Sequence, residues 1–434
     1  MVFLPHWPQL IGSKPIDLGL ERVLDLLDKL GNPHKKLPPV IHVAGTNGKG
    51  STIAFLSSIF KAAGLKAHIY TSPHLVNFNE RIVINYEQIS DEYLYELSEE
   101  CRIVAENNNI KVTFFEGTTA LAFLAFMRNP ADVILLETGL GGRLDATNVI
   151  EKPALTIITS ISLDHTEYLG PNEALIAREK AGIMKKDVPC VTSLQTEEVD
   201  FVLQQEAGRI NCPLYSYSYD WHSAEEKKKL VYYDSIKEQK NIYPLPSLMG
   251  LHQIINSGNA IAAVKLLKNF NISDDHICQG LTSTNWPGRL QKITKGRIIS
   301  LLPKLPKKSA WEIWLDGAHN EAGAYVLSQN LLTLTKKPIY MIFGMTKGRD
   351  TEKFLSHFKN IVKMVVGVLI KTEPSAYSAE QICSSAKNLN FVTYKAESID
   401  DAILHITKNA KEPGIILFAG SLYLASDVLK TGAF

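Results

Sequence analysis

The sequence predicts a protein of the α/β class, in which a doubly wound parallel sheet is followed by a second, smaller α/β series. Two observations support this prediction: apolar runs alternate with helix-like segments, and the apolar runs are continuous rather than alternating with polar residues. Strands that are covered on both faces of a parallel sheet have this composition. The length of 434 residues favours two domains, because single cores rarely grow beyond about 250–300 residues.

The first strand is expected at residues 40–44, where an apolar run enters a glycine-rich turn. An apolar-periodic segment over 51–63 then predicts a helix, and Gly64 is its expected cap. Residues 67–71 are predicted to form a second strand. Ser90 precedes acidic residues and a periodic apolar pattern, which indicates a capped helix.

Residues 132–137 and 155–161 are two further continuous apolar strands. From 213 to 246, tyrosine, serine and charged residues follow each other without a helical period, so we expect a hairpin excursion with a solvated turn at 225–229. A helical pattern returns over 252–267.

A domain boundary is expected near residue 295, because a second series of strands and helices begins beyond it. The strands of this series are predicted at 311–315, 338–343, 363–370 and 414–418. We find no internal repeat and no low-complexity segment.

Composition excludes several classes of protein. The chain is 45% hydrophobic and 21% charged, as in ordinary globular proteins, and its formal charge of +1 gives no bulk attraction to nucleic acid. Its longest apolar runs fall far short of the roughly 20 residues that span a bilayer. The start shows no signal peptide, and the five cysteines form no CxxC pair, so we expect a cytoplasmic protein with buried free thiols.

The strongest local signal is a glycine-rich loop between a predicted strand and a predicted helix. It consists of Gly45, Thr46, Asn47, Gly48, Lys49, Gly50, Ser51 and Thr52. Its glycines allow backbone N–H groups to approach a phosphate, Lys49 can neutralise the β- and γ-phosphates, and Ser51 can bind magnesium. Gly50 separates the lysine from the serine, which differs from the common Walker A spacing. The alternative is a glycine-rich turn without a ligand. ATP is favoured over GTP because no Asn-Lys-x-Asp segment occurs.

Further segments accompany this loop in a fixed order. They are Ser72-Pro-His-Leu-Val, Glu137-Thr-Gly-Leu-Gly-Gly-Arg-Leu-Asp-Ala-Thr-Asn, Leu163-Asp-His-Thr, Arg178-Glu-Lys-Ala-Gly and Leu315-Asp-Gly-Ala-His-Asn. In these segments the chain resembles the Mur-type amide ligases, and within them the bifunctional dihydrofolate synthase/folylpolyglutamate synthase branch. The similarity covers nearly the whole chain.

The resemblance implies a P-loop doubly wound domain over residues 1–292, which binds ATP and folate, and a smaller Rossmann-like α/β glutamate-ligase domain over 293–434. It implies an ATP-dependent ligase that joins L-glutamate to 7,8-dihydropteroate, to reduced folates, or to both, through an acyl phosphate. It also implies a monomer. A potassium requirement occurs in this type of ligase and stays open here.

The resemblance also assigns the residues of the nucleotide and metal sites. ATP would contact the loop 45–52 together with Asn256, Arg289 and Asp316. One magnesium ion would be held by Ser51, Ser72 and Glu137, and a second by His165 near Glu137. Lys180 is expected to be carbamylated, and it would serve catalysis with Lys49 and His319.

Other interpretations of these residues stay open. Glu137 could pair with Arg143, and Ser72 could be a cap or turn residue. Lys180 could be a surface lysine paired with Glu179 or Asp187. Without the resemblance, residues 316–320 indicate a strand–helix turn with Asn320 as the cap.

For the pterin, Thr113-Phe-Phe-Glu116 places two aromatic rings beside a carboxylate, which suits a flat heterocycle with donor nitrogens. The substrate residues expected with the resemblance are Ser13, Asp17, Arg81, Phe115, Glu116, Arg143, Leu144, Asp145 and Ala146. The alternatives are a core aromatic pair at 114–115 and a salt bridge from Arg81 to Glu80 or another acid.

Three other functions are compatible with parts of the sequence. One is folylpolyglutamate synthesis alone. Another is a peptidoglycan-type ligase, which is disfavoured because only 44 residues precede Gly45. The third is a non-catalytic nucleotide-binding protein, which the metal-type residues and Asp316 and His319 argue against.

Overall fold

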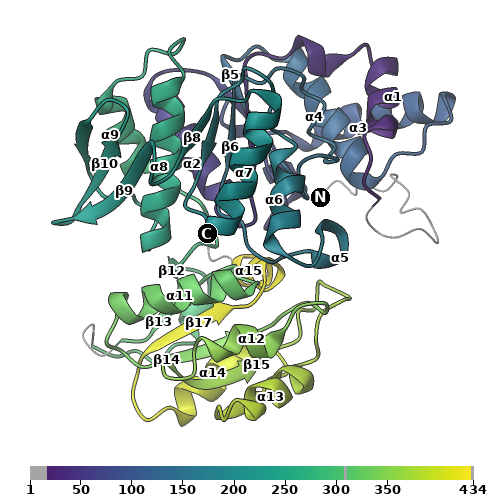
Figure 1. Ribbon diagram of the computed structural model, residues 1–434. Helices are drawn as coiled ribbons and strands as arrows, with labels where there is room; N and C mark the ends of the chain where they lie inside the picture. The colour runs from purple at the N-terminus through teal and green to yellow at the C-terminus, as the bar shows by residue number, and fades with distance from the viewer. Residues whose placement is uncertain (1–16, 307–309, 432–434) are drawn as a thin grey trace. The chain divides into compact units, whose positions relative to one another are not determined.

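The computed structural model describes residues 17–306 and 310–431. The chain divides into two compact units, and the main boundary lies between Asn285 and Trp286 (Figure 1). Residues 248–251 group with the second unit. The roles assigned to domains 1–292 and 293–434 stay predictions.

The first unit is built on an eight-stranded sheet in the order β4-β3-β2-β5-β1-β6-β7-β8. Its strands are β1 (Val40–Ala44), β2 (Ala67–Tyr70), β3 (Ile82–Ile84), β4 (Glu87–Gln88), β5 (Val133–Glu137), β6 (Leu155–Ile158), β7 (Cys190–Thr192) and β8 (Leu214–Ser216). The strands from β2 to β8 in this order pair in parallel, while β3 and β4 are antiparallel additions. The doubly wound parallel sheet is therefore confirmed, with β1 between strands that come later in the chain.

The helices of this unit are α1 (Glu21–Lys29), η1 (Pro33–Lys36), α2 (Lys49–Ala62), η2 (Phe78–Arg81), α3 (Asp91–Asn107), α4 (Phe114–Arg128), α5 (Thr166–Leu169), α6 (Glu173–Ala181), α7 (Glu197–Ile210), α8 (Leu251–Leu266) and α9 (Asp274–Ser283). The three helices predicted for this unit are present as α2, α3 and α8, with bounds that differ by a few residues, and further helices accompany them. Ser90 caps α3 by accepting a hydrogen bond from the Tyr93 N–H, as predicted. Helices α1, α3 and α4 share one apolar core, and α6 and α7 share another.

Strand β6 ends three residues earlier than the sequence predicts. The apolar run continues to Ile161, but the regular strand ends at Ile158. From Ser160 onward the backbone hydrogen-bonds to the glycine-rich loop that follows β1 instead of to a neighbouring strand. The last part of the predicted strand is therefore a loop whose backbone supports the glycine-rich turn.

Between α7 and α8, the predicted hairpin excursion is a three-stranded antiparallel sheet. Its strands are β9 (Trp221–Glu226), β10 (Lys229–Asp234) and β11 (Gln239–Tyr243). The turn predicted at 225–229 joins β9 to β10 through Lys227 and Lys228, which both have positive φ. Two-residue hairpin turns of this kind match the right-handed twist of the strands.

The second unit contains a six-stranded sheet in the order β12-β13-β17-β14-β15-β16. Its elements are β12 (Gln291–Ile293), α10 (Arg297–Ser300), β13 (Glu312–Leu315), α11 (Glu321–Leu334), β14 (Ile339–Phe343), α12 (Thr351–Ser356), β15 (Val362–Gly367), α13 (Ala379–Asn388), β16 (Thr393–Lys395), α14 (Ile399–Asn409), β17 (Ile415–Ala419) and α15 (Leu422–Leu429). All pairings are parallel except that of β12 with β13. Four of these strands coincide with predicted ones, while the short edge strands β12 and β16 do not.

Among the described residues, no helix is both long enough and apolar enough to span a membrane.

Close packing between α2 and α9 generates a stability prediction. A Cβ on Gly280 would lie 2.5 Å from Ile59 Cγ1 and 2.7 Å from the Ile59 backbone, so the two helices would have to separate. We expect Gly280→Ala to lower the free energy of unfolding by about 1–3 kcal/mol in urea titrations followed by circular dichroism. Gly208→Ala on α7 is the control, because nothing lies within 4 Å of its added Cβ, and it should be stabilising by about 0.5–1 kcal/mol. Equal effects of the two substitutions would contradict this packing.

Candidate active site

The glycine-rich loop connects the carboxyl end of β1 to α2, as predicted. Gly45 and Gly48 have φ values of 150° and 91°. A Cβ on Gly45 would lie 1.8 Å from Thr159 Oγ1, and one on Gly48 would lie 2.4 Å from Asn256 Oδ1. Both positions therefore need glycine because of packing as well as φ.

Segment 159–162 holds the first half of this loop. The Ser160 carbonyl accepts hydrogen bonds from the N–H groups of Thr46 (2.9 Å) and Asn47 (3.2 Å). The Thr46 hydroxyl donates to the Ser162 carbonyl, and it accepts from the Ser162 N–H. The N–H groups in the first turn of α2 have no acceptor within their own helix, and such groups at a helix N-terminus are suited to an anion.

Two lysines converge on the Gly45 carbonyl oxygen. Lys180 Nζ donates to it at 2.8 Å, and Lys49 Nζ donates to it at 3.0 Å and to the Thr46 carbonyl at 3.2 Å. Lys180 lies near the end of α6 and is only 4% exposed. The alternative of a surface lysine is therefore wrong for Lys180.

Burial, and to a lesser degree the nearby Lys49 ammonium, lower the pKa of Lys180 to about 7. Asp164 and Asp145 act in the opposite direction but do not restore the ordinary value. Near neutral pH, a substantial fraction of this amine is uncharged and hence nucleophilic.

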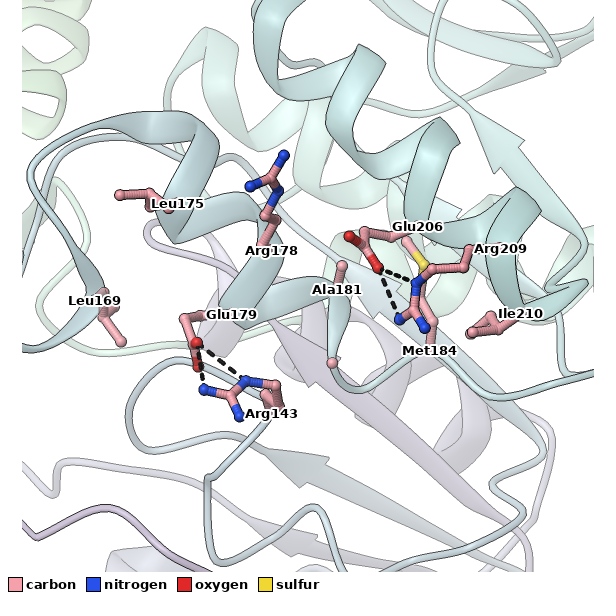
Figure 2. Close-up of a pocket in the computed structure, with 11 residues that line it drawn as sticks. Arg143, Leu169, Leu175, Arg178, Glu179, Ala181, Met184, Glu206, Arg209 and Ile210 are labelled. Carbon is pink, nitrogen blue, oxygen red and sulfur yellow. Dashed lines mark hydrogen bonds and ion pairs between the residues drawn. The ribbon is translucent and has the colours of Figure 1, made fainter.

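Glu137 ends β5 at the same edge of the sheet and is 4% exposed. Its Oε2 accepts a hydrogen bond from the Ser72 N–H at 3.2 Å, and its Oε1 lies 3.9 Å from Lys49 Nζ. The alternative ion pair with Arg143 is wrong, because Arg143 pairs with Glu179 at 2.8 Å (Figure 2). Ser72 precedes a cis peptide bond to Pro73.

Helix α8 supplies a polar network on the other side of the loop. Gln253 Nε2 donates to Ser51 Oγ at 3.3 Å, and its Oε1 accepts from Asn256 Nδ2 at 3.0 Å. These side chains are buried. Asn256 thus touches the loop at Gly48, while Gln253, which we did not predict as a site residue, orients the Ser51 hydroxyl.

The oxygen donors at this edge fit a magnesium ion. No group of three or more histidine, cysteine, aspartate or glutamate side chains suited to a metal occurs among the described residues. Magnesium instead binds few protein oxygens and keeps waters and phosphate oxygens, which suits Ser51, Ser72 and Glu137. His165 has a φ of 51° at the start of α5, and its Nε2 lies 3.9 Å from Asp164 Oδ1.

The predicted aromatic–carboxylate motif forms the start of α4. Thr113 and Glu116 make a capping box, which the Thr-x-x-Glu spacing of the sequence is sufficient to predict. Glu116 also pairs with Arg22 at 2.9 Å, and Arg22 pairs with Asp17 at 2.8 Å. The carboxylate of Glu116 therefore already has partners within the protein, and its role as a pterin acceptor stays a prediction.

The two phenylalanines of this motif point to different neighbours. The Phe115 ring lies over Gly139, where an added Cβ would be 2.4 Å from its Cζ. Phe114 packs edge-on against Phe78, and the Arg81 guanidinium lies over both of these rings. Arg81 Nε donates to His74 Nδ1 at 2.9 Å. The carboxylate of Glu80 accepts three backbone N–H groups of residues 75–77, so it stabilises a turn.

Asp145 organises the loop between β5 and β6. Its carboxylate accepts from the N–H groups of Leu140 and Thr147 and from the Thr147 hydroxyl. His42 lies 2.8 Å from the same hydroxyl. Asp145 is 2% exposed, Ala146 is buried and Leu144 is half-buried. Burial raises the pKa of Asp145.

In the second unit, Asp316 follows β13 and is buried. Its two oxygens accept from the N–H groups of Leu290 and Ala318, both at 2.8 Å. Burial raises its pKa, and the nearby Arg289 guanidinium opposes this change. His319 Nδ1 lies 3.1 Å from the Gly317 carbonyl, and Asn320 caps α11 as predicted.

Most predicted site residues thus lie in the first unit around the carboxyl ends of β1, β2 and β5, whereas Arg289, Asp316 and His319 lie together in the second unit. Ser13 lies outside the described residues.

A pocket of about 470 Å³ lies beside α6, on a face that includes the Arg143–Glu179 and Arg209–Glu206 pairs (Figure 2).

Comparison with known proteins identifies the chain's relatives. The family described as "Mur ligase middle domain" matches residues 43–264, and "Dihydrofolate synthetase, C-terminal domain" matches residues 302–431. The chain is 35% identical to the dihydrofolate synthase/folylpolyglutamate synthase of Bacillus subtilis, over 96% of this chain and 95% of that protein. The chain belongs to the dihydrofolate synthase/folylpolyglutamate synthase family. The predictions of the family, the fold class and an ATP-dependent ligase are confirmed.

Solved structures of family members have the same fold. The Escherichia coli FolC complex with DHPP and ADP matches with a TM-score of 0.85 and 30% identity, over 98% of this chain and 96% of that chain. A family member with Mn, AMPPNP and L-glutamate bound matches with a TM-score of 0.82 and 27% identity, over 96% of this chain and 95% of that chain.

The lowered pKa of Lys180 predicts a pH-dependent stability. Between pH 7 and the unfolded-state pKa of about 10.4, the unfolded chain binds more protons at this residue, so its contribution to the unfolding free energy rises with pH. We expect wild type to gain stability relative to Lys180→Met from pH 7 to 10 in carbon dioxide-free buffers, measured by urea unfolding. The exposed Lys152→Met is the control, and it should follow wild type. Parallel curves for Lys180→Met and wild type would contradict a neutral buried amine.

Proposed function

We propose that this family member joins L-glutamate to both 7,8-dihydropteroate and reduced folates, with hydrolysis of ATP to ADP and phosphate. The observation that carries this proposal is the convergence of Lys49 and Lys180 on Gly45, beside the buried carboxylate of Glu137. Folylpolyglutamate synthesis alone is the second candidate, since a relative from Lacticaseibacillus casei is named only for that activity.

In the first step, a carboxylate oxygen of the folate attacks the γ-phosphorus of ATP. The bond from this phosphorus to the β–γ bridging oxygen breaks, and ADP and an acyl phosphate form. Phosphoryl transfer depends mainly on positioning and on charge neutralisation. Lys49 would supply charge at the β- and γ-phosphates, while the first-turn N–H groups of α2 would hold their oxygens.

In the second step, the uncharged amino group of L-glutamate attacks the acyl carbon. The carbon–oxygen bond to phosphate breaks, inorganic phosphate leaves, and the nitrogen loses a proton as the amide forms. His319 is proposed to contact the glutamate or the transferred phosphoryl group. Asp316 and Arg289 are proposed to bind the nucleotide, as are Asn256 and the loop 45–52.

Ser51, Ser72 and Glu137 would hold one magnesium ion, and His165 with Glu137 a second. When bound, these ions would neutralise charge on the phosphates. The family member from Yersinia pestis has been solved as a complex with AMPPNP and a manganese ion, which supports a divalent metal at the nucleotide. A potassium ion is a further proposal.

We also propose that Lys180 is carbamylated. Its neutral amine attacks carbon dioxide, a nitrogen–carbon bond forms, and one proton is released. The product is an anionic oxygen donor, which suits a hard cation and would remove the repulsion between Lys180 and Lys49. Burial, which lowers the pKa of the amine, favours this reaction.

The pterin is proposed to lie near Phe115 and the loop containing Arg143, Leu144, Asp145 and Ala146. Asp17, Glu116 and Arg81 complete the described part of this proposed site. We further propose that the protein is a monomer and that it is cytoplasmic; the five free cysteine thiols agree with a reducing compartment.

Phosphate release with purified protein, ATP, magnesium and glutamate tests the function. Both dihydropteroate and tetrahydrofolate should support turnover, and release with only one would limit the enzyme to that activity. Lys49→Ala should lower the turnover number at least about 10³-fold, because the γ-phosphoryl group loses the cation that neutralises its charge during transfer. The surface variant Lys61→Ala should retain wild-type turnover. Full activity of Lys49→Ala would refute the role of Lys49.

Replacement of Lys180 tests the carbamate. Lys180→Ala should lose most activity, and small carboxylates such as acetate or formate should restore part of it by occupying the place of the carbamate. Carbon-13 NMR of the wild type with labelled bicarbonate should show a carbamate signal that the variant lacks. Wild-type activity in Lys180→Ala, or identical spectra, would exclude the modification as a catalytic feature.

A further inference from the structure

Gln195 is a residue outside the predicted site whose side chain contacts the support of the phosphate loop. It lies between β7 and α7, directly before Thr196, which caps α7 by accepting from the Val199 N–H. Its Nε2 donates to the Thr159 carbonyl, and its Oε1 accepts from the Ile161 N–H, both at 3.0 Å. A carboxamide is a side chain that offers a donor and an acceptor in this way, so the pair of contacts is specific for glutamine at this length.

The backbone that Gln195 holds is the segment that supports the phosphate loop from the opposite side. Between the two residues it contacts lies Ser160, whose carbonyl accepts from the N–H groups of Thr46 and Asn47. The Ser160 hydroxyl donates to the Asn47 carbonyl at 3.2 Å. The contacts of Gln195 therefore bracket the residue that holds the phosphate loop.

The two hydrogen bonds of Gln195 matter because segment 159–162 lies beyond the end of the regular sheet. Strand β6 ends at Ile158, so the ladder hydrogen bonds that would fix residues 159–161 in a longer strand are missing on the side of β7. The carboxamide of Gln195 takes their place. The same segment continues to His165, the residue proposed for the second magnesium ion.

We propose that Gln195 is a positioning residue for the nucleotide site: it fixes segment 159–162, and through it the conformation of the phosphate loop. The inference rests on the proposed binding of ATP by this loop. Loss of the carboxamide should leave the first unit folded but loosen the loop, so that the affinity for nucleotide falls more than stability does.

Gln195→Met and Gln195→Glu test this proposal. Methionine has a similar length and makes neither hydrogen bond, while glutamate keeps an acceptor but turns a carboxylate oxygen toward the Thr159 carbonyl. We expect the Kd for Mg·ADP in calorimetry to rise about tenfold in both variants, the size expected when one or two hydrogen bonds are lost. The KM for ATP should rise in parallel, while the KM for L-glutamate stays unchanged.

Gln204→Met is the matched control, because Gln204 lies on α7, is exposed, and donates within the described part of the chain to Asp200 alone. It should bind Mg·ADP as wild type does. A Kd within twofold of wild type in both Gln195 variants would overturn the proposal, as would a loss of folded structure in both, which would make Gln195 a residue of stability alone. If wild type itself binds no Mg·ADP, the proposed function fails instead.

Discussion

The candidate site depends on one atom, the carbonyl oxygen of Gly45, which accepts hydrogen bonds from both Lys49 and Lys180. Two ammonium groups that share one acceptor repel each other, and burial adds to the cost of charging Lys180. Gly45 has a φ that other residues rarely adopt, and a Cβ at this position would meet Thr159, so the turn that carries this carbonyl requires glycine. Burial and the neighbouring Lys49 therefore set the charge state of Lys180, whose hydrogen-bond acceptor lies 135 positions away in the sequence.

The surrounding charges favour a polyanion. Within the described residues, Glu137 is the carboxylate paired with Lys49, and its second oxygen accepts a backbone N–H from Ser72. Besides Lys180, and Asp164 and Asp145, which act on it, the polar groups at the loop include hydroxyls, amides and the N-terminal turn of α2, which carries partial positive charge. A nucleotide with a divalent ion balances such a site better than a neutral ligand would.

Continuous apolar runs, glycine spacing and capping residues were sufficient to predict the central strands β1, β2, β5 and β6 of the first sheet, four strands of the second, and the position of the phosphate loop. Short edge strands such as β12 and β16 were missed, because three residues carry too little pattern. The end of β6 was misplaced because the apolar run continues to Ile161, whereas the backbone beyond Thr159 hydrogen-bonds to the phosphate loop. Hydrophobicity alone carries no information about these partners. The burial of Lys180 and the contacts of Gln195 and Gln253 were also beyond the sequence, since they depend on residues that are distant along the chain.

The loop after β5 and helix α6 are joined more tightly than their separation in the chain suggests. The Arg143 N–H donates to the Glu179 carbonyl at 2.7 Å, Asn148 Nδ2 donates to the Gly182 carbonyl, and Gly142 has no room for a Cβ against residues 179–180. The two segments are consequently packed against each other through both backbone and side-chain contacts. Because Lys180 also donates to the Gly45 carbonyl, an unbroken chain of contacts runs from the loop after β5, through the end of α6, to the phosphate-binding turn.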